Sequence, residues 1–263
     1  MRKILLSLLT ISAVALVAVA ATGAFFSDTE TSTGNTFEAG SIDLKIDNTS
    51  YLNGVLQEGL SWELKDLDGE LFFDYQDLKP GDEGEDTVSL HVFENNAWAC
   101  VDLTITANDD VTCTEPELDD DVDCEEPGEG LGELADELEF IFWVDDGDNV
   151  LEDDEEILTQ GPASNVLGDV TWTLADSDEN NVGGIDGDPL TGSVDYFIGK
   201  AWCFGDLTPD ATASGQGVSP VVDSGIDCDG AGVDNASQTD LLEGTISFYA
   251  EQSKNNPDFQ CET

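Results

Sequence analysis

The densest set of side chains able to bind a metal is the acidic run at residues 145–156, which surrounds Gly147 with oxygen donors. Calcium takes about six to eight oxygen ligands, and loops of this kind supply them. The spacing differs from the regular EF-hand loop, in which acidic residues alternate before a glycine. The oxygen set that predicts a calcium site comprises Asp146, Asp148, the carbonyl of Val150, Glu152 and Glu155.

The alternative interpretation of this run is a solvated acidic turn, because the whole chain is acidic. It carries 59 acidic residues against 7 basic ones, a net charge of −52. A second, looser cluster at residues 176–181 is open to the same two interpretations. Nucleic acid is not expected as a partner, because phosphate binding needs clustered Lys and Arg, and anionic membrane surfaces are excluded by the same reasoning.

Six cysteines form the second reactive set, and none of them lies in a CxxC pair. An even number of cysteines in an exported chain predicts three disulfides. Fifteen pairings are possible, and the sequence does not select one. Our hypothesis pairs Cys113 with Cys124 across an acidic loop, Cys203 with Cys228 across a loop rich in Gly and Ser, and Cys100 with Cys261 at the C-terminus.

Enzyme chemistry finds little support in the residues. The single histidine, His91, lies in an alternating strand pattern and is interpreted as a solvated strand residue. The chain has no HExxH zinc motif, GxSxG elbow, P-loop or dinucleotide fingerprint. With so many carboxylates, a chance pair of acids says nothing about glycosidase activity. The sequence therefore predicts no catalytic residue and no organic cofactor.

The first 24 residues have the layout of a secretory signal peptide. Arg2 and Lys3 precede an uncharged apolar run at residues 4–21, and small residues then lead to a predicted cleavage between Ala24 and Phe25. A retained membrane anchor is the alternative, although about 18 residues barely span a bilayer. Cleavage would leave five lysines and no arginine, a net charge of about −54. We expect a secreted, extracellular protein without a membrane span.

Period-two alternation of apolar residues, the signature of a half-buried strand, recurs along the chain. The segments concerned are residues 41–47, 87–93, 97–106, 170–174, 194–198 and 246–250. A continuous apolar run at residues 140–144 predicts a strand buried on both faces. A helix is expected only around residues 131–138.

Breakers separate these strands, and Lys79-Pro80-Gly81-Asp82 has the residues of a type II turn. Gly-, Asn- and Asp-rich segments mark long loops. The fold class predicted is all-β, a jelly-roll-like β-sandwich with long acidic loops after the cleaved signal helix. We expect the sandwich to span residues 41–263, with loop insertions at about 107–135 and 205–235. Asn48 and Asn235 begin glycosylation sequons.

Three segments resemble the TasA/camelysin family of exported fibre proteins. The first begins at Ala24-Phe25-Phe26-Ser27-Asp28 and continues through residues 33–44, which is similar to the start processed by a SipW-type signal peptidase. The second is Leu78-Lys79-Pro80-Gly81-Asp82 with the following strand and residues 93–96. The third, at residues 244–252, is similar to the family's last core strand. Residues 110–235 match nothing in the family, and their cysteines depart from its pattern.

The resemblance implies a jelly-roll subunit of a biofilm matrix fibre or bundling pilus, which polymerises head-to-tail with copies of itself. Each mature N-terminus, here residues 25–40, would add as a strand to the next subunit. The segment contains no proline, is rich in Ser and Thr, and can gain main-chain hydrogen bonds at a sheet edge. The donor residues expected are Phe25, Phe26, Thr29, Thr31, Thr33, Thr36 and Phe37.

Three other interpretations remain open. The N-terminal segment could be a terminus that only links the signal to the fold. The chain could instead be a calcium-binding adhesion or binding module at the cell surface. A secreted, camelysin-like peptidase is the least favoured, because the sequence does not supply the usual metal ligands.

Overall fold

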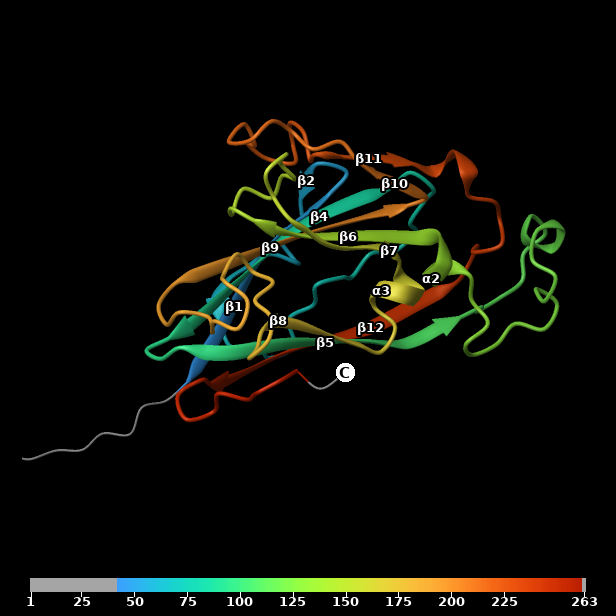
Figure 1. Ribbon diagram of the computed structural model, residues 1–263. Coiled ribbons are helices and arrows are strands. Elements are labelled where there is room, and N and C mark those ends of the chain that lie inside the picture. The colour runs from blue at the N-terminus through green and yellow to red at the C-terminus, as the bar shows by residue number, and fades with distance from the viewer. Residues whose placement is uncertain (1–41, 262–263) are drawn as a thin grey trace, which may run out of the picture. The chain divides into compact units, whose positions relative to one another are not determined.

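Buried and exposed side chains alternate along the strands as the sequence predicts. In β4 (Glu83–Phe93), the side chains of Val88, Leu90 and Val92 all enter the core. In β12 (Leu241–Gln252), Ile246 and Phe248 pack against the same core while their neighbours along the strand are exposed. The computed structural model describes residues 42–261, which form the all-β sandwich expected (Figure 1).

Two antiparallel sheets form the layers of the sandwich. The larger has the order β2-β1-β4-β9-β6-β7, with β3 also paired to β1; the smaller has the order β12-β5-β8. The remaining strands of the larger sheet are β1 (Asp43–Leu52), β2 (Val55–Leu56), β3 (Trp62–Lys65), β6 (Leu138–Asp145), β7 (Ile157–Pro162) and β9 (Asp195–Phe204). The smaller sheet is completed by β5 (Ala97–Asp109) and β8 (Val170–Ala175).

A two-stranded hairpin of β10 (Asp206–Pro209) and β11 (Ile226–Asp229) covers the outer face of the larger sheet. Because of this cover, β6 is buried on both faces, as its continuous apolar run predicts. Phe140 and Phe142 point into the main core, whereas Ile141 and Trp143 pack beneath the hairpin.

Helical turns are short and lie at the loops. They are η1 (Glu117–Asp119), α2 (Leu134–Glu137), α3 (Ala163–Val166) and η2 (Gly230–Gly232). The helix α2 lies inside the segment where the sequence predicts one. No helix within residues 42–261 is both long enough and apolar enough to cross a membrane.

Candidate functional site

The edge strand β12 presents a long free side. It pairs with β5 over its whole length, from Leu241 opposite Asp109 to Gln252 opposite Ala97. Among the described residues no strand pairs with its other side. An edge of this kind leaves backbone N–H and C=O groups able to pair with another strand.

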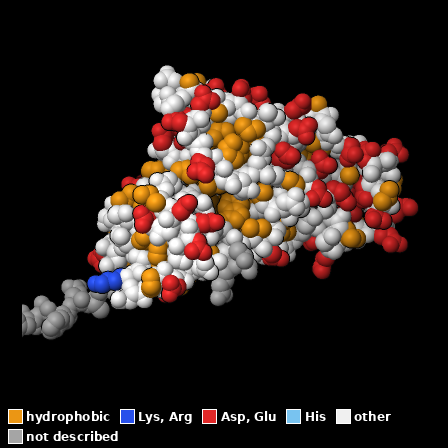
Figure 2. All heavy atoms as spheres, viewed as in Figure 1, with side chains coloured by type: hydrophobic (Ala, Val, Ile, Leu, Met, Phe, Trp, Pro, Cys, Tyr) orange, Lys and Arg blue, Asp and Glu red, His pale blue; other side chains and the backbone are white. Residues whose placement is uncertain are grey.

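A groove of about 1320 Å³ lies beside this free edge. Its walls are the beginning of β12, the middle of β5, and residues 70–80 between β3 and β4. Its apolar lining includes Phe72, Phe73, Leu103, Ile105, Leu138, Phe140, Trp202, Phe204, Leu242 and Ile246. The main core of the sandwich is therefore accessible from the β12 side. Figure 2 shows hydrophobic side chains reaching the surface in this view.

The wall opposite β12 is an extended segment that belongs to no strand. Two rings anchor it: the Phe72 ring lies 6.1 Å from that of Phe248 on β12, and the Phe73 ring 5.8 Å from that of Phe140 on β6. Between residues 71 and 78 the main chain makes no backbone-to-backbone hydrogen bond to any part of residues 42–261. Within the described part of the chain, backbone groups without a backbone partner thus flank the groove on both sides.

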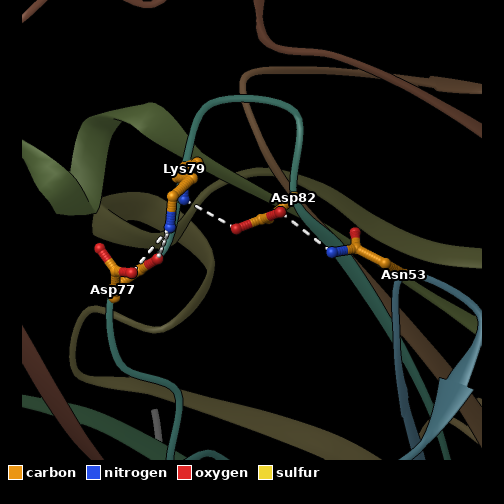
Figure 3. A network of polar contacts seen from close by, with 4 residues as sticks. All are labelled: Asn53, Asp77, Lys79 and Asp82. Carbon is orange, nitrogen blue, oxygen red and sulfur yellow. Dashed lines mark hydrogen bonds and ion pairs between the residues drawn. The ribbon is translucent and has the colours of Figure 1, made fainter.

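The predicted turn at residues 79–82 closes one end of this wall. Asp82 N donates to Lys79 O at 2.8 Å, and Gly81 adopts φ +87°, the left-handed geometry that a type II turn requires. Figure 3 shows the polar contacts around it: Lys79 Nζ contacts Asp77, and Asp82 accepts hydrogen bonds from Lys79 N and Asn53 Nδ2. The turn thereby joins β4 to the β1–β2 connection.

A buried ion pair lies beneath the groove. Lys200 on β9 faces Asp86 on β4, with Nζ 2.9 Å from Oδ2, at an angle outside hydrogen-bond geometry. The ammonium also lies 3.7 Å from the centre of the Phe73 ring, a cation–π contact. Asn48 donates to the other Asp86 oxygen at 3.3 Å and is itself 1% exposed, which leaves no room for a glycan there.

The acidic run at residues 145–156 forms a structured loop that β6 positions. The structure brings Asp146 and Glu155 together with Asp145, with one oxygen of each within 4.8 Å of the others. Asp145 was not in the predicted ligand set, and it orders the loop. Its carboxylate accepts hydrogen bonds from Gly147 N, Asn149 N and the Trp143 indole.

The other predicted ligands lie elsewhere in the loop. Glu152 accepts hydrogen bonds from Gly215 N and Gly217 N, so both of its oxygens hold the 205–235 loop. Asp148 accepts from Val150 N, and its second oxygen lies next to Gly217. The side chain of Val150 is fully buried. The four predicted carboxylate ligands therefore divide between two places: Asp146 and Glu155 lie beside Asp145, whereas Asp148 and Glu152 lie beside Gly217.

Burial dominates the electrostatics of this loop. Together with the charges of neighbouring carboxylates, it raises the pKa of Asp145 to about 6 and that of Glu155 to about 8. The group Asp145, Asp146 and Glu155 has the oxygen chemistry to hold a hard cation. In the second cluster, Asp176 accepts from the backbone N–H groups of Asp178, Glu179 and Cys261, and so fixes the C-terminal segment.

His91 is not the solvated residue expected from its strand phase. Its Nδ1 lies 2.6 Å from Asp195, and its Nε2 lies 3.0 Å from Ser89 Oγ. The order Asp–His–Ser is that of a hydrolase triad. Ser89, however, is 1% exposed and donates its hydroxyl hydrogen to Asp47. This hydroxyl is not accessible to a substrate, so we interpret the array as a polar cross-strand network.

Three disulfides join Cys100 to Cys261, Cys113 to Cys124 and Cys203 to Cys228, the pairs hypothesised from the sequence. They indicate that the chain matures in an oxidising environment. Two close the long insertions, and the third ties the C-terminal segment to β5, beside β12. The Cys113–Cys124 loop is densely acidic, and Figure 2 shows Asp and Glu side chains crowded over it.

The predicted signal peptide, its cleavage point at Ala24 and Phe25, and all donor-strand residues lie outside the described part of the chain. A comparison of the chain with protein-family models gives no match, and neither does a comparison with curated proteins.

Proposed function

We propose that this chain is a secreted structural subunit of an extracellular fibre and polymerises by N-terminal strand addition. One observation carries the proposal: the free edge of β12 borders a groove that leads to the apolar core. The occupant is residues 25–37 of a second copy of the chain. Their backbone pairs with β12, and alternate side chains enter the groove.

The chemistry of both partners supports this assignment. The groove offers apolar walls, and the donor segment has aromatic residues at each end, Phe25 and Phe37, with Ser and Thr between them. Each subunit donates at one place and accepts at another. Such head-to-tail contacts do not close, so they build filaments.

Signal cleavage is the switch in this mechanism. While residues 1–24 remain attached, the apolar leader keeps the N-terminal end of the donor segment from reaching another subunit. Cleavage by a SipW-type signal peptidase frees that end. The disulfides support an extracellular location, as does the signal layout of the leader. The resemblance of residues 24–44 and 78–96 to the TasA/camelysin family points to the same function.

Electron microscopy of the purified mature protein, residues 25–263, tests the proposal. We expect filaments from this chain and soluble monomers from a variant that lacks residues 25–36. A mixture of the two should give short filaments, because the truncated subunit still accepts a donor strand but cannot donate one. Globular particles from the mature protein under all salt conditions would contradict the proposal.

A pair of edge variants tests the acceptor. Ile246 points into the groove, whereas Ser247 is its exposed neighbour on the opposite face of β12. Ile246→Lys should prevent assembly because the lysine occupies the groove, and Ser247→Lys should assemble like the parent. Circular dichroism and melting of both variants verify the fold. Assembly of a folded Ile246→Lys protein would place the acceptor edge elsewhere.

A further inference from the structure

Five carboxyl groups converge where β5 ends and β12 begins, away from the acidic run that the sequence singles out. They are Asp110, Glu117, Asp121, Glu133 and Asp240. Oxygens of Asp110, Glu117 and Asp240 lie within 4.8 Å of one another, and Glu117 is equally close to Asp121. The β5–β12 pairing brings residues 110 and 240 together, and the loop closed by the Cys113–Cys124 disulfide supplies Glu117 and Asp121.

Each of these carboxyl groups has one buried oxygen without a hydrogen-bond partner among residues 42–261. These atoms are Asp110 Oδ1, Glu117 Oε1, Asp121 Oδ2, Glu133 Oε2 and Asp240 Oδ1. Glu117 is 0% exposed, Asp110 3% and Asp121 8%. A buried polar atom without a partner destabilises the fold, and more so when it is charged. Because carboxylate oxygens of Asp110, Glu117 and Asp240 lie within 4.8 Å of one another, one ligand would satisfy several of these groups together.

The second oxygens of three of these groups are already fixed by the protein. Glu117 Oε2 accepts from Thr114 N at 3.0 Å, and Asp121 Oδ1 accepts from Asp123 N at 2.8 Å. Asp240 Oδ2 accepts from the N–H groups of Glu133 and Leu134, at the start of α2. Each of these carboxylates is thus held rigidly through one oxygen, and its unpartnered oxygen is left for a ligand.

No basic side chain satisfies the cluster. The ion pairs within residues 42–261 all lie elsewhere in the fold, around Lys45, Lys65, Lys79, His91 and Lys200. At neutral pH the five groups would repel one another unless a cation lay between them.

We propose that this cluster is a calcium site. Preorganised carboxylate oxygens suit a hard divalent cation, and a site with this many ligands suits calcium better than magnesium, which keeps several waters. The nearby Cys124 sulfur is part of a disulfide, so it is not a soft metal ligand. Bound calcium joins the end of β5, the disulfide-closed loop, the start of α2 and the start of β12.

Calorimetric titration of calcium into the purified, chelator-treated chain tests the proposal. The work is done in 1 M KCl, because so acidic a chain attracts divalent cations diffusely and salt screens that attraction. We expect saturable binding and a calcium-dependent rise in melting temperature. Glu117→Gln should weaken this binding at least tenfold while its remaining carbonyl oxygen can still accept from Thr114. Asp110→Asn provides a second variant, should Glu117→Gln fail to fold.

The matched control is Glu155→Gln in the 145–156 loop, which should leave binding at the cluster unchanged. Two results would overturn the proposal. One is the absence of saturable calcium binding by the parent chain. The other is binding that Glu155→Gln abolishes and that Glu117→Gln and Asp110→Asn leave intact, which would assign the ion to the predicted loop instead.

Discussion

At the scale of single residues, the buried pair Lys200 and Asp86 is the most consequential polar feature of the core. Burial lowers the pKa of the Lys200 ammonium, and the negative charge of Asp86 opposes that shift. Removing one partner of such a pair leaves an unpaired buried charge, which costs about 3–5 kcal/mol. We therefore expect Asp86→Ala to lower the free energy of unfolding by about this amount in denaturant titrations.

The double variant Asp86→Leu with Lys200→Met is the control for this prediction. It removes both charges and fills the site with apolar side chains, and replacing a buried ion pair in this way is often neutral or stabilising. It should therefore be more stable than Asp86→Ala alone. If the double variant were the less stable of the two, the contact between the Lys200 ammonium and the Phe73 ring would matter more than the cost of burying the two charges.

Glu85 gives a second prediction at this scale, concerning pH. Burial, together with the charges of Glu83 and Asp86, raises the pKa of Glu85 to about 8. The folded state therefore holds a proton that the unfolded state releases near its ordinary value of 4.5. Stability is then highest at low pH for this group and falls as pH rises from about 4.5 through 8.

Glu85→Gln should remove this slope, since a glutamine stays neutral at every pH. The measurement is the melting temperature of both proteins between pH 5 and pH 9 in a constant high salt concentration, which suppresses the general repulsion among carboxylates. We expect the two curves to diverge as the pH rises, with the variant more stable at pH 9. Parallel curves would show that Glu85 ionises freely in the fold.

At the scale of elements, the disulfides differ in how much chain they constrain. Cys100 and Cys261 are separated by 161 residues, whereas Cys113 and Cys124 are separated by 11. In the chain-entropy model a longer closed loop gives the larger stabilisation, about 5 kcal/mol against about 3 kcal/mol here. Replacing Cys100 and Cys261 by serine should thus destabilise the fold more than replacing Cys113 and Cys124.

Denaturant titration in the presence of a chelator measures this difference without any contribution from calcium. The two pairs of cysteine-to-serine substitutions also test the proposed calcium site. Loss of the Cys113–Cys124 bond frees the loop that carries Glu117 and Asp121, so it should weaken calcium binding. Loss of the Cys100–Cys261 bond should leave calcium binding largely unchanged. Equal destabilisation by both pairs of substitutions would argue against the chain-entropy account.

The strands were the elements that the sequence predicted best, because the alternation of apolar and polar residues shows which face of a strand is buried. The patterns in residues 87–93, 97–106 and 246–250 predict parts of β4, β5 and β12. The continuous run at residues 140–144 identifies β6 as doubly buried. Short strands such as β2, β3 and β10 lack enough residues to show a period, so the sequence does not predict them.

The acidic cluster at the β5–β12 end was missed for a different reason. Its members are spread from residue 110 to residue 240, and only strand pairing brings them together. In a chain with 59 acidic residues, each of them looks like surface. The prediction that His91 is exposed to solvent was wrong for a related reason. Neighbouring groups such as Asp195 cover the outer face of β4, and the strand phase does not show them.

At the scale of the whole molecule, the net charge opposes folding and would also oppose assembly of the proposed fibre. A charge of −52 opposes compaction and also opposes contact between subunits. The Debye length falls from about 10 Å at 0.1 M to about 3 Å at 1 M ionic strength, so salt removes most of this repulsion. We expect the melting temperature to rise by on the order of 10 °C between 0.1 and 2 M KCl.

The way in which the melting temperature depends on KCl concentration distinguishes charge screening from the general strengthening of apolar burial by salt. Screening is nearly complete once the Debye length is shorter than the spacing of surface charges, so most of the rise should occur below about 1 M. Strengthened apolar burial would instead continue to grow with salt concentration.

If filaments form by strand addition, their yield at a fixed protein concentration should follow the same saturating curve, measured by sedimentation. A yield that decreases with added KCl would mean that ionic contacts, rather than backbone pairing and apolar burial at β12, hold the subunits together.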